Sequence, residues 1–184
     1  MIQVRIHGRG GQGVVTSAEL IAIAAFKSGK EAQAFPFFGV ERTGAPIEAY
    51  ARIDTKPIRI REQVYRPNTV IVTDDTLIGI VDVTKGCDQQ SIIIINSSKN
   101  KSLFIDKLKL PEKNIFTVDA TKIALEIFKK NITNTVILGA FAEITKYISL
   151  ADLELAIKEK FEEKGKEIIE KNIMAIEKAF DIIA

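Results

Sequence analysis

The sequence predicts an α/β fold: a single domain with a mainly parallel sheet, one antiparallel hairpin and helices on both faces of the sheet. Three observations support this class. Residues 2–7 alternate between apolar and polar side chains, break at a glycine cluster and continue as an apolar helix over 14–27. The segments 69–73, 91–96 and 115–118 are largely apolar, as is typical of parallel strands that helices cover on both faces. Two alternating runs on either side of a proline turn predict the hairpin.

The first helix, over 14–27, is expected to end at Gly29, because glycine readily adopts the backbone conformation that closes a helix. The segment 31–37 is short, leans apolar and predicts a second strand beside the first. Residues 37–46 contain two glycines and a proline. They therefore predict a loop with a charged centre rather than a regular element.

The hairpin is predicted from two alternating runs, 47–53 and 58–61, which are separated by a turn at Pro57. The polar face of this hairpin carries three arginines, namely Arg52, Arg59 and Arg61. This face is interpreted either as a solvated surface or as a contact with another subunit.

The second half of the chain alternates apolar strands with helices. Asp74 or Asp75 is expected to cap a short helix that reaches Ile80, and Asp119 a helix over 120–130. Three more helical segments are predicted, over 134–147, from a cap at Ser149, and over 165–184. The sequence contains no internal repeat and no linker, so residues 1–184 are interpreted as one domain.

Composition restricts the class of protein. The 26 lysines and arginines nearly balance the 24 acidic residues, so we expect neither a nucleic-acid nor a membrane-surface role. The single cysteine, Cys87, excludes an internal disulfide and is too few for an iron–sulfur cluster or a structural zinc site. With no apolar leader and no apolar run of 18 residues, we expect a protein of the reducing cytoplasm.

The glycine turn that follows the first strand is the first candidate site. Gly8, Gly10 and Gly13 match the G-x-G-x-x-G pattern of dinucleotide-binding proteins, and Gly11 makes the turn richer in glycine than that pattern needs. The pattern also expects an acidic residue about 20 positions later, at the end of the second strand. Glu31 lies near that distance but precedes the strand. The turn is therefore interpreted as either an anion-binding site or a place of close backbone packing.

Other catalytic patterns are absent from the sequence, which has one histidine and neither a G-x-S-x-G nor a G-x-x-x-x-G-K-[ST] segment. His7 lies where a functional histidine is expected in an α/β sheet, although local hydrogen bonds would equally explain it. Lys85 could lower the pKa of the Cys87 thiol, and the alternative is an ordinary free thiol.

Three segments together, 8–14, 35–46 and 134–140, resemble the gamma subunit of 2-oxoacid:ferredoxin oxidoreductases. The resemblance covers almost the whole chain, up to 170–172. The form F-P-x-F-G-x-E-R-x-G-A-P is more similar to the pyruvate and branched-chain enzymes than to the 2-oxoglutarate enzymes. Two positions depart from the family: Phe37 stands where serine is usual, and Thr43 where a second arginine is usual. An anion contact by that second arginine therefore has no counterpart here.

The resemblance implies a gamma (accessory) subunit of a heterotetrameric pyruvate:ferredoxin oxidoreductase, or pyruvate synthase. The complex would convert pyruvate, CoA and oxidised ferredoxin to acetyl-CoA, CO2 and reduced ferredoxin. Thiamine diphosphate, Mg and the 4Fe-4S clusters are then expected on the alpha, beta and delta subunits. Two alternatives stay open: the same role in a 2-ketoisovalerate:ferredoxin oxidoreductase, and a free-standing dinucleotide-binding protein.

Two overlapping sets of site residues follow from this resemblance and from the chemistry of the side chains. The first would contact CoA phosphates or a neighbouring subunit: Gly8, Arg9, Gly10, Gly11, Gln12, Gly13 and Arg42. The second would lie in the interface with the catalytic subunits: Phe37, Phe38, Glu41, Arg42 and Thr43. Interface packing alone is the alternative to phosphate binding. The aromatic cluster of Phe35, Phe37 and Phe38 also predicts self-association of the isolated chain.

Overall fold

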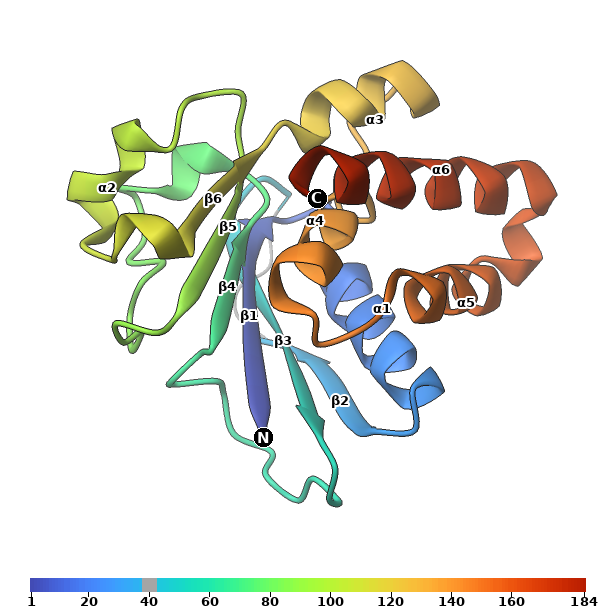
Figure 1. Cartoon of the computed structure of the whole chain (residues 1–184), viewed down its shortest axis with the longest axis horizontal. Coiled ribbons are helices and arrows are strands. Elements are labelled where there is room, and N and C mark those ends of the chain that lie inside the picture. The colour runs from blue at the N-terminus through green and yellow to red at the C-terminus, as the bar shows by residue number, and fades with distance from the viewer. Residues whose placement is uncertain (38–42) are drawn as a thin grey trace.

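The computed structural model describes residues 1–37 and 43–184, and within them six strands form one mixed sheet (Figure 1). The strand order is β2-β3-β1-β4-β5-β6. The bounds are β1 Ile2–Arg9, β2 Glu31–Pro36, β3 Pro46–Asp54, β4 Thr69–Val72, β5 Ile92–Asn96 and β6 Ile115–Val118. β1, β4, β5 and β6 run parallel, whereas β3 is antiparallel to both of its neighbours, β1 and β2.

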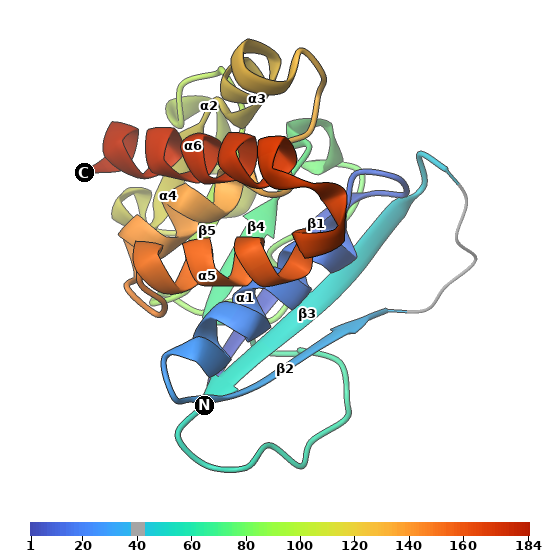
Figure 2. The same cartoon turned by 90° about the vertical axis from the view of Figure 1, so that its right-hand side faces the viewer.

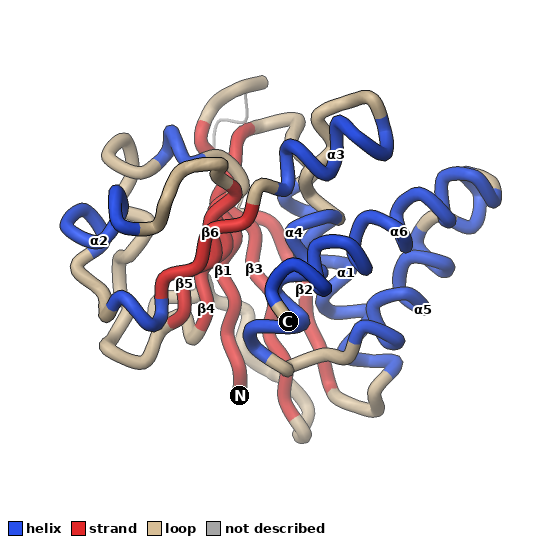
Figure 3. Tube along the Cα trace, turned by 45° about the horizontal axis from the view of Figure 1, so that its top comes forward, coloured by secondary structure: helices blue, strands red, loops and turns tan. Residues whose placement is uncertain are grey.

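Helices cover both faces of this sheet, as predicted. One face carries α1 (Val14–Lys27), α4 (Val136–Thr145), α5 (Leu150–Lys160) and α6 (Lys166–Ile183), with α3 (Ala120–Phe128) packed on α4 and α6. Figure 2 shows α1, α5 and α6 stacked beside one another on this side. The opposite face carries α2 (Ser102–Leu108), which Figure 3 shows across the sheet from α5 and α6.

The two helical layers enclose two separate apolar cores. Ile71 on β4 contributes to the larger core, beneath α1 and α4, whereas its neighbours Val70 and Val72 contribute to the smaller core, beneath α2. All three side chains are fully buried. This double burial is why the short parallel strands are apolar at successive positions rather than at alternate ones.

The predicted pairing of the antiparallel strands is wrong. The hairpin is formed by β2 and β3, while the predicted strand 58–61 forms no strand. β2 was expected beside β1, but β3 lies between them. Because β1 and β2 occupy both edges of β3, no edge remains on which 58–61 could pair, and the chain from 55 to 68 runs as a long loop.

Arg52 corrects the interpretation of the arginine-bearing face. Arg59 and Arg61 are exposed, but Arg52 is only 1% exposed. Its guanidinium donates to the backbone oxygens of Glu62 (2.5 Å) and Gln63 (3.1 Å). Arg52 therefore ties the long loop to the sheet and forms neither a solvated surface nor a subunit contact.

The predicted helix caps are confirmed. The side chains of Asp74, Asp119 and Ser149 accept hydrogen bonds from backbone N–H groups in the turns that follow them. The element after Asp74 is only a 3-10 turn, Asp75–Leu77, and does not extend to Ile80. Within the described ranges, no helix is long and apolar enough to cross a membrane.

Candidate functional site

The glycine turn packs tightly between β1 and α1. A Cβ atom on Gly8 would overlap both Val14 Cγ2 and Thr73 Oγ1, and one on Gly13 would lie 2.7 Å from Asn134 Nδ2. Gly13 also has a φ of +72°, a value that glycine adopts without steric strain. Close packing therefore requires glycine at these two positions.

Asp74, at the end of β4, holds the turn in place. Arg9 Nε donates to Asp74 Oδ2 at 2.8 Å, and Gln12 Nε2 donates to the same oxygen at 3.3 Å. Burial alone would raise the pKa of Asp74, but hydrogen bonds from Thr76, Arg9 and Gln12 outweigh it and lower the pKa below its usual value. The charge of Arg9 is thus already met by an ionised carboxylate within the chain.

The turn also contacts the end of the second predicted site segment. The backbone N–H of Gly10 donates to the carbonyl of Ala45 at 2.9 Å, and the N–H of Gly44 donates to the carbonyl of Gly10 at 3.1 Å. Arg9 Nη1 adds a bond to the carbonyl of Gly44 at 3.0 Å. The structure therefore brings together segments that lie more than thirty residues apart in the sequence.

Two of the five predicted interface residues, Phe37 and Thr43, lie within the described part of the chain, and both are exposed. Phe37 is 40% exposed, and its ring lies edge-on to Tyr50 with centroids 6.5 Å apart. Thr43 is exposed beside the glycine turn, where it forms an isolated bridge with Gly10. Phe38, Glu41 and Arg42 lie outside the described residues.

A hollow of about 390 Å³ opens between the glycine turn and the start of β3. Its lining residues are Gly10, Gly11, Gly13, Val14, Val15, Thr43 and Ile47. Val14 and Val15 are the first two residues of α1. Because the first N–H groups of a helix have no partner within it, this hollow has the local chemistry of an anion site.

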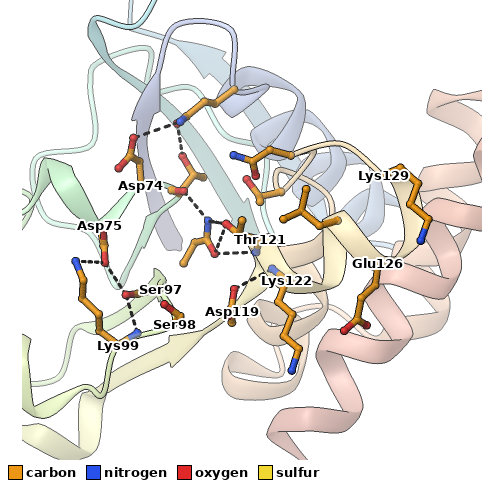
Figure 4. Close-up of a pocket in the computed structure, with 16 residues that line it drawn as sticks. Asp74, Asp75, Ser97, Ser98, Lys99, Asp119, Thr121, Lys122, Glu126 and Lys129 are labelled. Atoms are coloured by element: carbon orange, nitrogen blue, oxygen red, sulfur yellow. Dashed lines mark hydrogen bonds and ion pairs between the residues drawn. The ribbon is translucent and has the colours of Figure 1, made fainter.

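A larger crevice of about 740 Å³ lies at the carboxyl ends of β4, β5 and β6 (Figure 4). In open α/β sheets this edge is where ligands usually bind. Within it, Asn96 Nδ2 donates to the carbonyl of Thr73 at 2.9 Å, and Asp75 accepts from Ser97 Oγ at 2.6 Å and pairs with Lys99 Nζ at 3.0 Å. Gln12 also lines the crevice and so connects it to the glycine turn.

Sequence reasoning missed this crevice, although a signal was present. Each apolar parallel strand is followed at once by polar residues, such as Thr73 after β4, Ser97 after β5 and Asp119 after β6. The carboxyl ends of parallel strands lie at the same edge of a sheet, so the residues that follow these strands lie close together.

His7 is buried, and Cys87 is half-buried. His7 is 2% exposed, its Nδ1 lies 3.5 Å from Glu48 Oε1, and its Nε2 has no partner among the described residues. Burial lowers the pKa of His7 to about 4, so the imidazole is neutral at pH 7. The Glu48 carboxylate is thus near only one of the two ring nitrogens. Burial raises the pKa of Cys87, which favours the ordinary thiol over a reactive one.

The positions of Glu31 and of the cysteine bear on cofactors. Glu31 begins β2 and pairs with Asp54, which places it at the end of the sheet opposite the glycine turn, with β3 between. It therefore cannot bind a ribose at that turn.

A 4Fe-4S cluster takes four cysteines and the chain has one. Within residues 1–37 and 43–184, no group of three or more His, Cys, Asp or Glu residues could hold a metal ion.

Comparison with known proteins identifies relatives along the whole chain. A family model described as pyruvate ferredoxin/flavodoxin oxidoreductase matches residues 3–182. The common subunit gamma of the pyruvate/ketoisovalerate oxidoreductases of Pyrococcus furiosus is 51% identical over 181 residues, covering 98% of this chain and 96% of that protein. The pyruvate synthase subunit PorC of Methanothermobacter thermautotrophicus is 47% identical over 183 residues, covering 100% of this chain and 96% of that protein.

A solved structure agrees with the sequence relatives. The pyruvate oxidoreductase subunit PORC of Thermotoga maritima matches with a TM-score of 0.85 at 34% identity, covering 98% of this chain and 95% of that one. Fold, sequence and family model therefore agree over nearly the full length. The chain belongs to the pyruvate ferredoxin/flavodoxin oxidoreductase family.

Proposed function

We propose that this chain is the gamma (accessory) subunit of a pyruvate:ferredoxin oxidoreductase, in which alpha, beta and delta subunits carry the redox and thiamine chemistry. The observation that carries the proposal is the full-length match to relatives named as gamma and PorC subunits. The chain's chemistry fits this role, because its single cysteine cannot ligate a 4Fe-4S cluster. The cytoplasm is the compartment we propose, since a lone free thiol suits reducing conditions.

The proposed partner-facing surface consists of the glycine turn and the adjoining residues 43–46. The hollow beside the turn is lined by the start of α1 and would accept one phosphate of CoA on backbone N–H groups. Arg9 is already paired with Asp74 and adds little positive charge there. The charge of the phosphate must therefore be met by Arg42, which lies outside the described residues, or by a neighbouring subunit.

Packing against a neighbouring subunit is the alternative role for this surface. The hydrogen bonds between Gly10, Gly44 and Ala45 give it a fixed shape without any ligand. A shape fixed in this way suits a protein interface as well as a phosphate.

The choice of 2-oxoacid is a separate question from the role of the subunit. The Pyrococcus relative is named as common to pyruvate and ketoisovalerate oxidoreductases. We therefore propose that the other subunits select the substrate, and that this chain would serve either a pyruvate or a 2-ketoisovalerate complex.

Reconstitution of the complex with and without this chain tests the proposal. The alpha, beta and delta subunits of the same organism would be mixed with the chain, and CoA-dependent reduction of ferredoxin by pyruvate would be measured. We expect the chain to copurify with the thiamine-binding subunits and to be required for full activity. Activity of the isolated chain, or the absence of thiamine-binding subunits from its complexes, would refute the proposal.

The Arg42→Ala variant separates the two roles of the surface, with the exposed Arg59→Ala as the matched control. A raised KM for CoA in an intact complex indicates phosphate binding, because the variant loses only a cation. Weakened assembly at unchanged KM indicates packing. If both quantities match those of the control, Arg42 has neither role.

A further inference from the structure

A third pocket, mostly apolar and about 400 Å³ in volume, is lined by residues of α1, α3 and α6 and of the segments next to them. Its apolar lining consists of Phe128, Ile132, Phe161 and Ile168. Three lysines, Lys130, Lys164 and Lys171, also line it, and none of the described residues that line the pocket is acidic. The pocket thus combines an apolar interior with positive charge.

Two of the three lysines are free to pair with an incoming anion. Lys171 Nζ already contacts Glu167 Oε1 at 2.6 Å. Among the described residues, Lys130 and Lys164 form no ion pair. A carboxylate placed between them would meet uncompensated positive charge, while an apolar side chain beside it would cover the exposed carbons.

The exposure of the lining favours a protein surface over a small molecule. Ile132, in the connection between α3 and α4, is 39% exposed, and Ile168, in α6, is 42% exposed. The volume of the pocket is near the lower limit of small-ligand cavities. A chain segment laid across the pocket would cover both isoleucines.

We propose that this pocket docks an acidic, apolar segment of a neighbouring subunit in the complex. In this arrangement an aliphatic or aromatic side chain enters between Phe128 and Phe161, and an adjacent carboxylate pairs with Lys130 and Lys164. The inference rests on the proposed function, which supplies the neighbouring subunits.

The pocket adjoins the proposed partner-facing surface through Asn134. This residue lines the pocket, and its side chain is the group that a Cβ on Gly13 would approach. Ser17 Oγ fixes the same residue by donating to its carbonyl at 2.9 Å. A subunit that covers the glycine turn can therefore extend around the start of α1 and reach the pocket.

Charge reversal at the rim tests this docking. The Lys130→Glu/Lys164→Glu variant would be compared with Lys56→Glu/Lys113→Glu, which changes the same charge at exposed positions outside the pocket. Affinity for the assembled alpha, beta and delta subunits would be measured by biolayer interferometry at low and high salt. We expect the rim variant to lose at least about tenfold in affinity at low salt, and the control to bind like the original chain.

Further variants keep the test decisive. Lys130→Arg/Lys164→Arg keeps the positive charge and should retain the affinity, and Ile132→Ser should weaken it at every salt concentration. Circular dichroism would check that the Lys130→Glu/Lys164→Glu variant is folded. If this folded variant binds the other subunits with unchanged affinity, the proposed docking is wrong. If the original chain itself fails to bind the other subunits, the proposed function fails instead.

Two other occupants of the pocket, a small carboxylate and a second copy of the chain, are tested in parallel. Titration of the isolated chain with octanoate tests for a small carboxylate, and sedimentation of the rim variant tests for a second copy of the chain. Saturable octanoate binding, or loss of self-association, without any change in subunit affinity would assign the pocket to that occupant and overturn the proposal.

Discussion

His7 and Gly8 lie next to each other at the end of β1, and a different physical constraint fixes each of them. His7 is neutral because burial disfavours its charged form more strongly than the nearby Glu48 carboxylate favours it. Gly8 is required because Val14 and Thr73 occupy the space of a larger side chain. Both positions stand out in the sequence as candidate functional residues. The contacts that constrain them cannot be inferred from it, because they come from β3, α1 and the end of β4.

His7 is expected to make the chain less stable in acid. Its pKa is about 4 in the folded chain and near 6.5 in the unfolded chain, so only the unfolded state takes up a proton between these values. The free energy of unfolding should therefore fall as the pH is lowered from 7 to 4.5, by about 2.5 kcal/mol from this residue alone. Urea titrations of the original chain and of His7→Gln would measure this.

The difference between the two proteins isolates His7 from the carboxylates, which titrate in both. His7 is the only histidine in the chain, so no other imidazole contributes. Parallel loss of stability in the two proteins down to pH 4.5 would show that His7 is not neutral when buried.

Gly8→Ala is expected to destabilise the chain by about 1–3 kcal/mol, because its methyl group overlaps the side chains of Val14 and Thr73. The matched test is a double-mutant cycle with Val14→Ala, which removes one of the two overlapping atoms. Gly8→Ala should cost less in the Val14→Ala background when both are measured by urea unfolding. An equal cost in the two backgrounds would contradict the proposed overlap.

At the scale of elements, two helices of the large core approach each other closely at Gly139. This glycine lies in α4, and a Cβ there would overlap the backbone oxygen of Ile176 in α6. Every residue of α4 from Val136 to Ala142 is buried. The absence of a side chain at Gly139 thus sets how closely α6 packs on the layer beneath it.

Gly139→Ala should therefore destabilise the fold by about 1–3 kcal/mol, even though alanine is the better helix former. The obstacle is a backbone oxygen, which cannot rotate away as a side chain could. Thermal and urea unfolding would be compared with Ala151→Ser, which also adds one heavy atom but at an exposed helical position. An increase in stability over the original chain would show that α4 and α6 can separate without loss.

The elements that sequence predicted well are those fixed by local chemistry. The helix caps at Asp119 and Ser149 depend on residues within one turn. The strand that pairs with β3 and the burial of Arg52 depend on segments far away in the sequence. The alternation of apolar and polar residues alone therefore predicted the wrong partner for β3 and the wrong exposure for Arg52. α2 was not predicted because its seven residues bury only Phe104 and Leu108, too few to produce a helical pattern.

The candidate site was likewise predictable only where local chemistry fixes it. The glycine turn was recognisable because glycine has a distinct conformational role. Its contacts with Asp74, Ala45 and Asn134 could not be inferred, because each comes from a separate part of the chain.

At the scale of the whole molecule, β2 is an edge strand that is followed directly by an exposed aromatic residue. Phe35 packs against Tyr50 with ring centroids 5.2 Å apart and lies beneath the Arg52 guanidinium. Phe37 is 40% exposed. Apolar surface next to an open sheet edge favours association with another chain.

The isolated chain is therefore expected to self-associate reversibly at high concentration, and Phe37→Ser should weaken this association. Sedimentation velocity over a range of concentrations would measure it. Leu103→Ser is the control, because Leu103 is 60% exposed but lies in α2, on the opposite face of the sheet. Sedimentation as a monomer at every concentration, or an equal effect of both variants, would contradict this prediction.

Strand β1 is synthesised before both of its neighbours in the sheet, β3 and β4, between which it lies. Its hydrogen-bonding partners, 46–54 and 69–72, leave the ribosome only after α1 and β2 have done so. Until then the backbone of β1 has no neighbour in the sheet, and its apolar side chains have no completed core. A nascent chain of this protein must therefore remain incompletely folded until residue 72 has emerged, and during this interval it is most exposed to chaperones and proteases.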